Sequence, residues 1–334
     1  MRIIGQSTLM KTKNLLRSKA LLLFTFFLLF ASVPYAQPAK PDTVKVGVYI
    51  TSIHDIDFKQ KEFSTNLWLW LRYKKKEFNF LDNLEIPGAK SVEKSFAVVD
   101  SSGDEIYMQM KLQCVMKDSW KISNFPFDKQ NLRFSIENSQ YDSRSLVYIP
   151  DTVGNHFDPR FAINGWKIDS CTLSTSLKTY ETGFGVENLE KPKTEYSVFR
   201  VRMVITRDAT GIFWKVFLGM YIAFLIAYVC FYIHSDGMDS RFGLSVGSLF
   251  AVIGNKYIID STLPETTSFT LVDTLHGLTL FSILLIITAT AYSLILVKRN
   301  ELKKAKWFDM LAAQILLVLY VGFNLYFIAQ ASAN

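Results

Sequence analysis

Hydrophobic and polar positions follow two patterns along the chain, and the change comes near Gly211. Before it, short apolar runs are separated by turn residues. In FRVRMVITR, every second residue from Phe199 to Ile205 is apolar, and Arg200 and Arg202 lie between them. Alternation over such short runs predicts strands, and several of them at this spacing predict a sandwich. We therefore expect residues 37–210 to form an all-β, immunoglobulin-like sandwich.

After Gly211 the apolar runs become long and nearly free of charge. The second run is the shortest and contains glycines and Lys256. Runs of this length predict a four-helix transmembrane bundle over residues 211–334, and hence a multi-pass membrane protein. The segment TRDATG alone joins the last predicted strand to the first helix, so the two regions should be coupled mechanically. The four runs are Ile212–Ile233, Phe242–Ile259, Phe269–Val297 and Trp307–Ala329.

The first residues resemble a secretory signal. A basic stretch precedes the apolar run Ala20–Ala31, and cleavage after Ala36 defines a signal peptide over residues 1–36. An uncleaved N-terminal anchor is the alternative. The basic loop Lys298–Lys306 is expected on the cytoplasmic side, which places residues 37–210 outside. We expect a cell-membrane protein, in the inner membrane if the cell is Gram-negative, with its N-terminal domain outside.

The net charge of +7 does not indicate nucleic-acid binding. The leader carries five positive charges and Lys298–Lys306 adds four net, so the remainder is slightly acidic. No basic face is left for a phosphate backbone, and nucleic acid is not an expected partner.

Cysteine and histidine positions give little evidence of reactive chemistry. Cys230 lies in an apolar run, so Cys114 and Cys171 are the only candidate disulfide pair, with two buried free thiols the favoured interpretation. The histidines show no metal-ligand spacing, and we expect no metal and no cofactor. Gly243–Gly247 reads G-x-S-x-G, but it lies inside a predicted membrane helix rather than in a strand–turn–helix. We therefore predict no catalytic residues and no enzyme.

Four motifs follow one another along the chain. They are Asp57 followed by STNLWLWLRY with Trp68, FPFDKQ (Phe125–Gln130), Arg207 twelve residues before Gly219, and RFGLSVGSLF through LPETT (Arg241–Thr267). In this order they resemble the motifs of the pentameric ligand-gated ion channels, the Cys-loop receptor superfamily. The resemblance covers nearly all of the mature chain.

The departures from the family pattern indicate a bacterial-type member lacking the loop disulfide. Asp118 and Leu132 occupy the places of the two cysteines that close the family's loop. Gly219 stands where relatives usually have proline, and the loop between helices three and four is short.

The resemblance implies a coupling layer between the outer domain and the helices. Arg207 is expected to face two carboxylates and to form charge-assisted hydrogen bonds with them. The alternative is that this cluster only attaches the domain to the membrane region. The implied gating residues are Asp57, Phe125, Pro126, Phe127, Asp128, Arg207 and Pro264.

The resemblance also implies that one face of the second helix lines a pore. Phe250 would form a ring that closes the path by dewetting, and Asp239 an acidic ring that favours cations. Alternatively, Gly243 and Gly247 pack between helices while Ser245, Ser248 and Asn255 face water. The implied pore set is Asp239, Gly243, Gly247, Phe250, Gly254, Tyr257 and Ser261.

An agonist site between subunits is the third implication. Trp68 matches the aromatic residue that one subunit contributes from its complementary face. Matches to the principal face of the neighbouring subunit are Tyr141, Phe184 and Tyr196. Ser139 occupies the place of the family's central tryptophan, which argues against a quaternary-amine site. The alternative is that these aromatic residues only pack the edge of the sandwich.

Together these expectations describe a homopentameric, cation-selective channel opened by a ligand. Its expected partners are identical subunits, a small-molecule or proton agonist, permeant ions and the lipid bilayer. A non-conducting membrane receptor or scaffold and a membrane-anchored enzyme are the alternatives.

Overall fold

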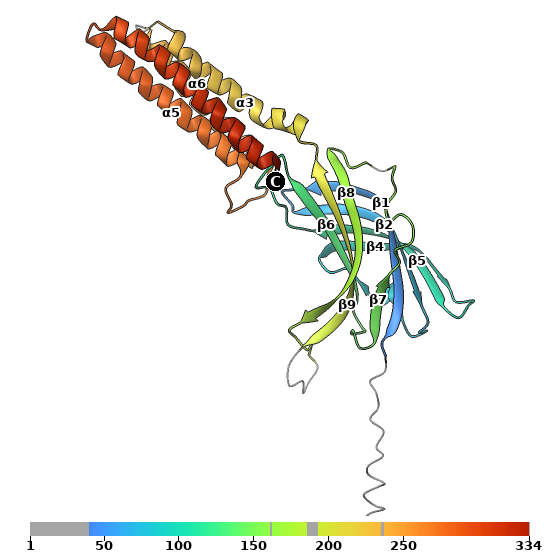
Figure 1. The fold of residues 1–334 in the computed structure, drawn as a ribbon. Coiled ribbons are helices and arrows are strands. Elements are labelled where there is room, and N and C mark those ends of the chain that lie inside the picture. The colour runs from blue at the N-terminus through green and yellow to red at the C-terminus, as the bar shows by residue number, and fades with distance from the viewer. Residues whose placement is uncertain (1–39, 161, 186–192, 235–236, 334) are drawn as a thin grey trace, which may run out of the picture. The chain divides into compact units, whose positions relative to one another are not determined.

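The computed structural model describes residues 40–160, 162–185, 193–234 and 237–333. The predicted signal peptide lies outside these ranges. The described N-terminal region is built almost entirely of strands (Figure 1). In order they are β1 (Asp42–Asp57), β2 (Glu62–Tyr73), the short helix α2 (Phe80–Asn83), β3 (Leu84–Glu85), β4 (Ala89–Asp100), β5 (Ile106–Lys117), β6 (Lys129–Asn138), β7 (Leu146–Pro150), β8 (Trp166–Tyr180) and β9 (Thr194–Arg207).

The strands form two sheets with one core between them. One sheet has the order β4-β5-β2-β1-β7, and the other β3-β6-β9-β8. Alternation explains the core: in β2, Leu67, Leu69 and Leu71 are all fully buried, as every second residue of a strand points to the same face. On β9, Val201 and Met203 are buried in the same cluster. The predicted all-β sandwich is confirmed.

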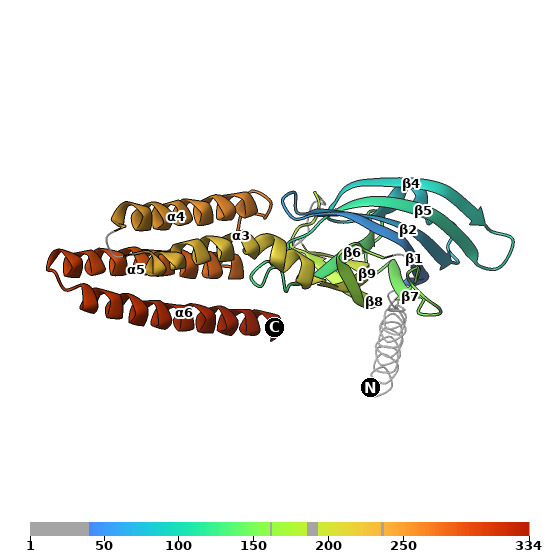
Figure 2. The same cartoon turned by 90° about the horizontal axis from the view of Figure 1, so that it is seen from above.

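Four apolar helices follow the sandwich (Figure 2). They are α3 (Ala209–Val229), which continues into the short 3₁₀ turn η1 (Cys230–Tyr232), α4 (Met238–Asp260), α5 (Leu271–Lys298) and α6 (Leu302–Ala333). Each is long and apolar enough to cross a membrane. Helix α5 packs against α3, α4 and α6. The predicted order of a sandwich followed by four candidate membrane helices is confirmed.

All three cysteines are free in the described chain, and Cys114 is buried as expected, whereas Cys171 is only half-buried. Cys114 lies in the sandwich core with 1% of its surface exposed. Burial raises the pKa of its thiol to about 12, because the apolar surroundings disfavour the thiolate.

We predict that Cys114 resists alkylation in the folded protein. At pH 8 a thiol with this pKa is deprotonated in only about one molecule in ten thousand, and the thiolate is the nucleophile. Iodoacetamide labelling followed by peptide mass spectrometry should modify Cys114 only after denaturation. Labelling of Cys114 in the native protein at the denatured rate would contradict the buried position.

Candidate functional site

A small pocket lies beside the loop that joins β8 to β9. It encloses about 320 Å³ and contains an aromatic triad of Tyr180, Phe184 and Tyr196. The three rings meet edge to face, with centroid separations of 5.5 to 6.1 Å. Such packing orients the rings relative to one another, and Phe184 stays largely exposed at the pocket. Part of this loop, residues 186–192, lies outside the described ranges.

A buried carboxylate forms the floor of this pocket. Glu137 accepts hydrogen bonds from Lys178 Nζ at 3.1 Å and from the Tyr180 hydroxyl at 2.7 Å, and its side chain is 3% exposed. Burial raises the pKa of Tyr180 above its ordinary value, so the phenol keeps the proton that it donates to Glu137. The pocket is thus a rigid, aromatic and acidic recess.

We predict that Glu137→Gln lowers the free energy of unfolding of the outer domain by about 2 kcal/mol, since charge-assisted bonds to a buried acceptor are lost. Urea denaturation followed by near-ultraviolet circular dichroism measures this. Glu195→Gln is the matched control, because Glu195 is exposed and its carboxylate, among the described residues, accepts only from the Thr179 hydroxyl, at 3.3 Å. Equal effects of the two substitutions would contradict the role of Glu137.

The structure brings together only part of the predicted ligand set. Phe184 and Tyr196 line the pocket, and so does Ser139, at the place of the family's tryptophan. Tyr141 packs instead on Phe78, with ring centroids 4.8 Å apart. Trp68 belongs to the other sheet, on β2, where its ring faces Phe96. A residue of a complementary face would meet this pocket only from a second subunit, so Trp68 stays a prediction.

The Arg207 guanidinium is held by one carboxylate and three aromatic rings. Its Nε lies 2.6 Å from Asp128 Oδ1 and its Nη2 lies 3.1 Å from Asp128 Oδ2, a bidentate pair. The guanidinium carbon also lies 4.0 Å from the Trp166 ring centre, 4.6 Å from that of Phe58 and 4.9 Å from that of Phe125. Cation–π contacts and a bidentate pair together require the planar guanidinium.

Asp57 does not join this ion pair. Its carboxylate is exposed and caps the turn after β1, where it accepts from the Gln60 amide at 2.7 Å. The expectation of two carboxylates around Arg207 is therefore wrong in the described chain, since an exposed turn satisfies Asp57 locally. Asp57 still contacts the coupling layer through its backbone, because its carbonyl accepts a hydrogen bond from Trp120 Nε1 at 3.0 Å.

The FPFD loop connects this arginine to the membrane helices. Phe125, which touches Arg207, belongs to the same buried cluster as Phe217 of α3. Phe127 packs on Phe213 of α3, with ring centroids 5.8 Å apart. One residue of the loop region is bonded directly to α5, since the Leu271 amide donates to the Ser123 carbonyl at 2.8 Å. The Phe125–Pro126 peptide is cis.

Pro264 is buried in the connection between α4 and α5. Nearby, Lys256 of α4 forms ion pairs with Asp260 at 2.6 Å and with Asp273 of α5 at 2.8 Å. Asn255 of α4 also bonds His276 of α5, at 3.3 Å. The end of α4 is thus tied to the helix that contacts the FPFD loop.

Helix α4 packs with one face and leaves the other uncovered in the single chain. Ser245 and Ser248 are 0% and 2% exposed, and Ser245 contacts Cys230 Sγ at 3.2 Å. Phe250 and Tyr257 are 66% and 76% exposed. The predicted pore residues all lie on the exposed face: Asp239, Gly243, Gly247, Phe250, Gly254, Tyr257 and Ser261. The alternative, with Ser245 and Ser248 facing water, disagrees with this packing.

Comparison with known proteins now adds an independent observation. No family model matches the sequence. The chain is 24% identical over 254 residues to a proton-gated ion channel of Gloeobacter violaceus, a match that covers 69% of this chain and 67% of the relative. The resemblance to the pentameric ligand-gated ion channels is confirmed. The relative is an ion channel, so the prediction that the chain is not an enzyme is confirmed as well.

Sequence reasoning missed three residues of these sites. Glu137 and Tyr180 form the floor of the aromatic pocket, and Trp166 stacks on Arg207. Each of these contacts joins residues about forty positions apart, so no local spacing could have found them. A weak signal did exist in β6, because the alternation ends at Ile136, Glu137 and Asn138, which are all buried.

Proposed function

We propose that five identical copies of this chain form a ligand-gated, cation-selective channel in the cell membrane, with the β-sandwich outside and the four helices spanning the bilayer. The second membrane helix, α4, lines the pore, and Asp239 forms the acidic ring at its cytoplasmic mouth. The Phe250 ring closes the path between openings. The domains we propose are a signal peptide over residues 1–36, a ligand-binding sandwich over 37–210 and a pore domain over 211–334.

The observation that carries this proposal is the continuous connection from the outer domain to α4. Arg207 ends β9 immediately before α3, pairs with Asp128 and touches Phe125. The loop that holds Asp128 is bonded to the first residue of α5, and α5 is tied to α4 through Lys256. A change in the sandwich therefore has a short route to the helix that we place at the pore.

The agonist acts on the outer domain and must bind the open state more tightly than the closed one. A small molecule would occupy the pocket of Tyr180, Phe184 and Tyr196, completed by Trp68 of a neighbouring subunit. A proton is the other candidate, because the Gloeobacter relative is a proton-gated channel. Both agonists act through the same coupling layer.

Planar-bilayer recording of the purified full-length protein tests the proposal. We expect currents when the outer-domain side is stepped from neutral to acidic pH or is given an agonist, with a reversal potential that follows the cation gradient. Asp239→Lys should move that potential toward the anion value, whereas Glu301→Gln, on the loop before α6, should not. Native mass spectrometry should give five subunits. Assembled wild-type protein that conducts under no condition would favour the non-conducting scaffold.

A further inference from the structure

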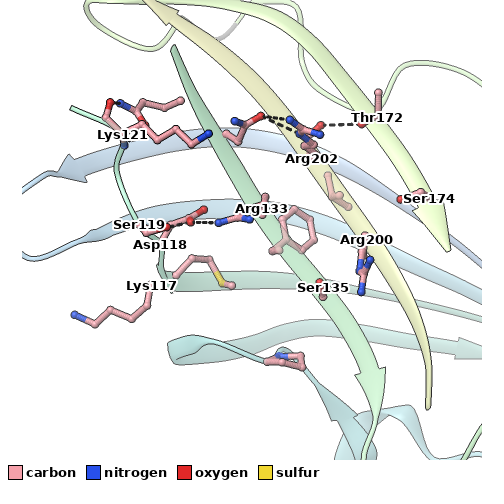
Figure 3. A pocket seen from close by; sticks show the side chains of 16 residues that line it. Lys117, Asp118, Ser119, Lys121, Arg133, Ser135, Thr172, Ser174, Arg200 and Arg202 are labelled. Carbon is pink, nitrogen blue, oxygen red and sulfur yellow. Dashed lines mark hydrogen bonds and ion pairs between the residues drawn. The ribbon is translucent and has the colours of Figure 1, made fainter. Parts of the chain in front are cut away.

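A second and larger cavity lies beside the segment that joins β5 to β6, and it shares no lining residue with the aromatic pocket. It encloses about 900 Å³, within the range of small-molecule sites. Its walls are the outward faces of β6, β8 and β9 together with the segment that follows β5 (Figure 3). Five of its lining residues are cationic and only one is acidic. The cations are Lys117, Lys121, Arg133, Arg200 and Arg202.

Carboxylates pair with two of these five cations, and three have no such partner among the described residues. Asp118 pairs with Arg133 at 2.6 Å, and its carboxylate is 4% exposed. Lys117 bonds Glu62, which points it away from the other cations. Arg202 has only a neutral partner, Asn131, whose Oδ1 accepts from its Nε and Nη2 at 2.8 and 2.6 Å. Charges therefore remain uncompensated along the sheet.

The strand register brings arginines of neighbouring strands together. Arg133 of β6 lies directly opposite Arg202 of β9, and like charges in that position destabilise a sheet. Two residues before Arg202 on β9, Arg200 lies between Ser135 of β6 and Ser174 of β8. Within the described chain, the Arg200 guanidinium forms no hydrogen bond or ion pair, although the backbone of Arg200 is paired in the sheet. Figure 3 shows Arg200 and Arg202 at successive positions along β9, with the Arg200 guanidinium directed away from Arg202.

From this juxtaposition we propose that the cavity is a binding site for a small, multiply charged oxyanion such as a polyphosphate or a polycarboxylate. The arginine guanidinium groups form bidentate, charge-assisted bonds with such an anion, and the hydroxyl groups of Ser135 and Ser174 donate beside them. The anion compensates the charges of Arg200 and Arg202, which pair with no carboxylate of the described chain. This site is separate from the aromatic pocket, which is acidic.

The cavity is also bonded to the coupling layer. Gln130 lines it, and its side chain accepts from the Lys121 amide at 3.1 Å and donates to the Lys121 carbonyl at 2.8 Å. The same side chain donates to Asp128, the partner of Arg207. An anion held by Lys121 and Arg200 therefore biases the position of Asp128 and acts as a modulator of opening. This consequence rests on the proposed channel function, whereas binding of the anion does not.

Isothermal titration calorimetry of the full-length protein in detergent, with pyrophosphate as the probe, tests the site. We expect saturable binding that weakens with rising salt, and a loss of roughly 10- to 100-fold in affinity for Arg200→Gln. Arg200→Gln breaks no hydrogen bond of the described fold, so the variant should fold normally. Arg200→Lys should recover part of the affinity. Arg160→Gln is the matched control, since the Arg160 side chain is 86% exposed and, among the residues that the structure describes, pairs with Asp158 alone.

Two results would overturn the proposal: equal affinity of wild type and Arg200→Gln, or binding to vesicles of anionic phospholipid with none to pyrophosphate. In planar bilayers, pyrophosphate on the outer-domain side should shift the agonist concentration for half activation in wild type and not in Arg200→Gln. If calorimetry shows the Arg200-dependent site but no variant conducts, the proposed channel function fails and the binding site stands.

Discussion

Arg207→Gln should abolish agonist-evoked current in a protein that still assembles, and Arg207→Lys should reduce it by at least about tenfold, or ~1.4 kcal/mol in the gating equilibrium. The guanidinium is 8% exposed and the Asp128 carboxylate is 2% exposed, so this is a buried pair. Removing one partner of such a pair costs about 3–5 kcal/mol, because the other charge is left without compensation. Lysine keeps the charge but lacks the planar fork that Asp128 and Trp166 both contact.

A double-mutant cycle of Arg207→Lys, which keeps residual current, with Asp128→Asn separates coupling from simple attachment of the domain. If the two residues act as one unit, the double variant should lose little more current than either single variant. Size-exclusion chromatography and surface labelling should give the wild-type oligomer in each case. Arg160→Lys is the control at an exposed pair. Wild-type currents from Arg207→Lys or additive losses in the cycle would contradict a gating role.

Phe250→Ala should produce current without agonist, or lower the agonist concentration for half activation by about tenfold, ~1.4 kcal/mol in the closed–open equilibrium. In the proposed pentamer this substitution removes five aromatic rings from mid-membrane and so weakens the dry constriction that blocks ions. Phe250 has no packing role to lose within one chain, because 66% of its surface is exposed. The fold of the helix should therefore survive.

Phe323→Ala is the matched control for Phe250. Phe323 is also an exposed phenylalanine of a membrane helix, 48% exposed on α6, which packs on α5. The control should leave basal current and agonist sensitivity unchanged. An equal change in both variants would indicate a general effect of apolar surface on the bundle instead of a gate at Phe250.

The parts predicted well from the sequence depend on local pattern. Alternation in FRVRMVITR follows from the two faces of a strand, and β9 buries Val201 and Met203 as expected. The uninterrupted apolar runs predicted all four membrane helices to within a few residues of their ends. The FPFD loop was recognisable as a motif. The hydrogen bond from the Leu271 amide of α5 to Ser123, just before this loop, could not be predicted from the sequence.

The parts that sequence reasoning missed depend on distant segments meeting. Arg207 was expected beside Asp57 because both are charged and both match family positions. In the structure, the Asp57 carboxylate accepts a hydrogen bond within the turn after β1 instead. The rings of Phe58, Phe125 and Trp166 contact the guanidinium where a second carboxylate was expected. Arg200 and Arg202 were read as the polar face of a strand. Only the register, which places Arg133 opposite Arg202, shows that these arginines belong to a cluster of cations at the cavity.

The most direct test of the central claim is whether water and ions reach Phe250 and not the opposite side of α4. In planar bilayers, a cationic methanethiosulfonate reagent should progressively block the agonist-evoked current of Phe250→Cys. It should leave wild type and Ser248→Cys unaffected, since Ser248 is buried and bonded within its own helix. Block of Ser248→Cys with none of Phe250→Cys would contradict the account, because α4 would then present its other face to the ions.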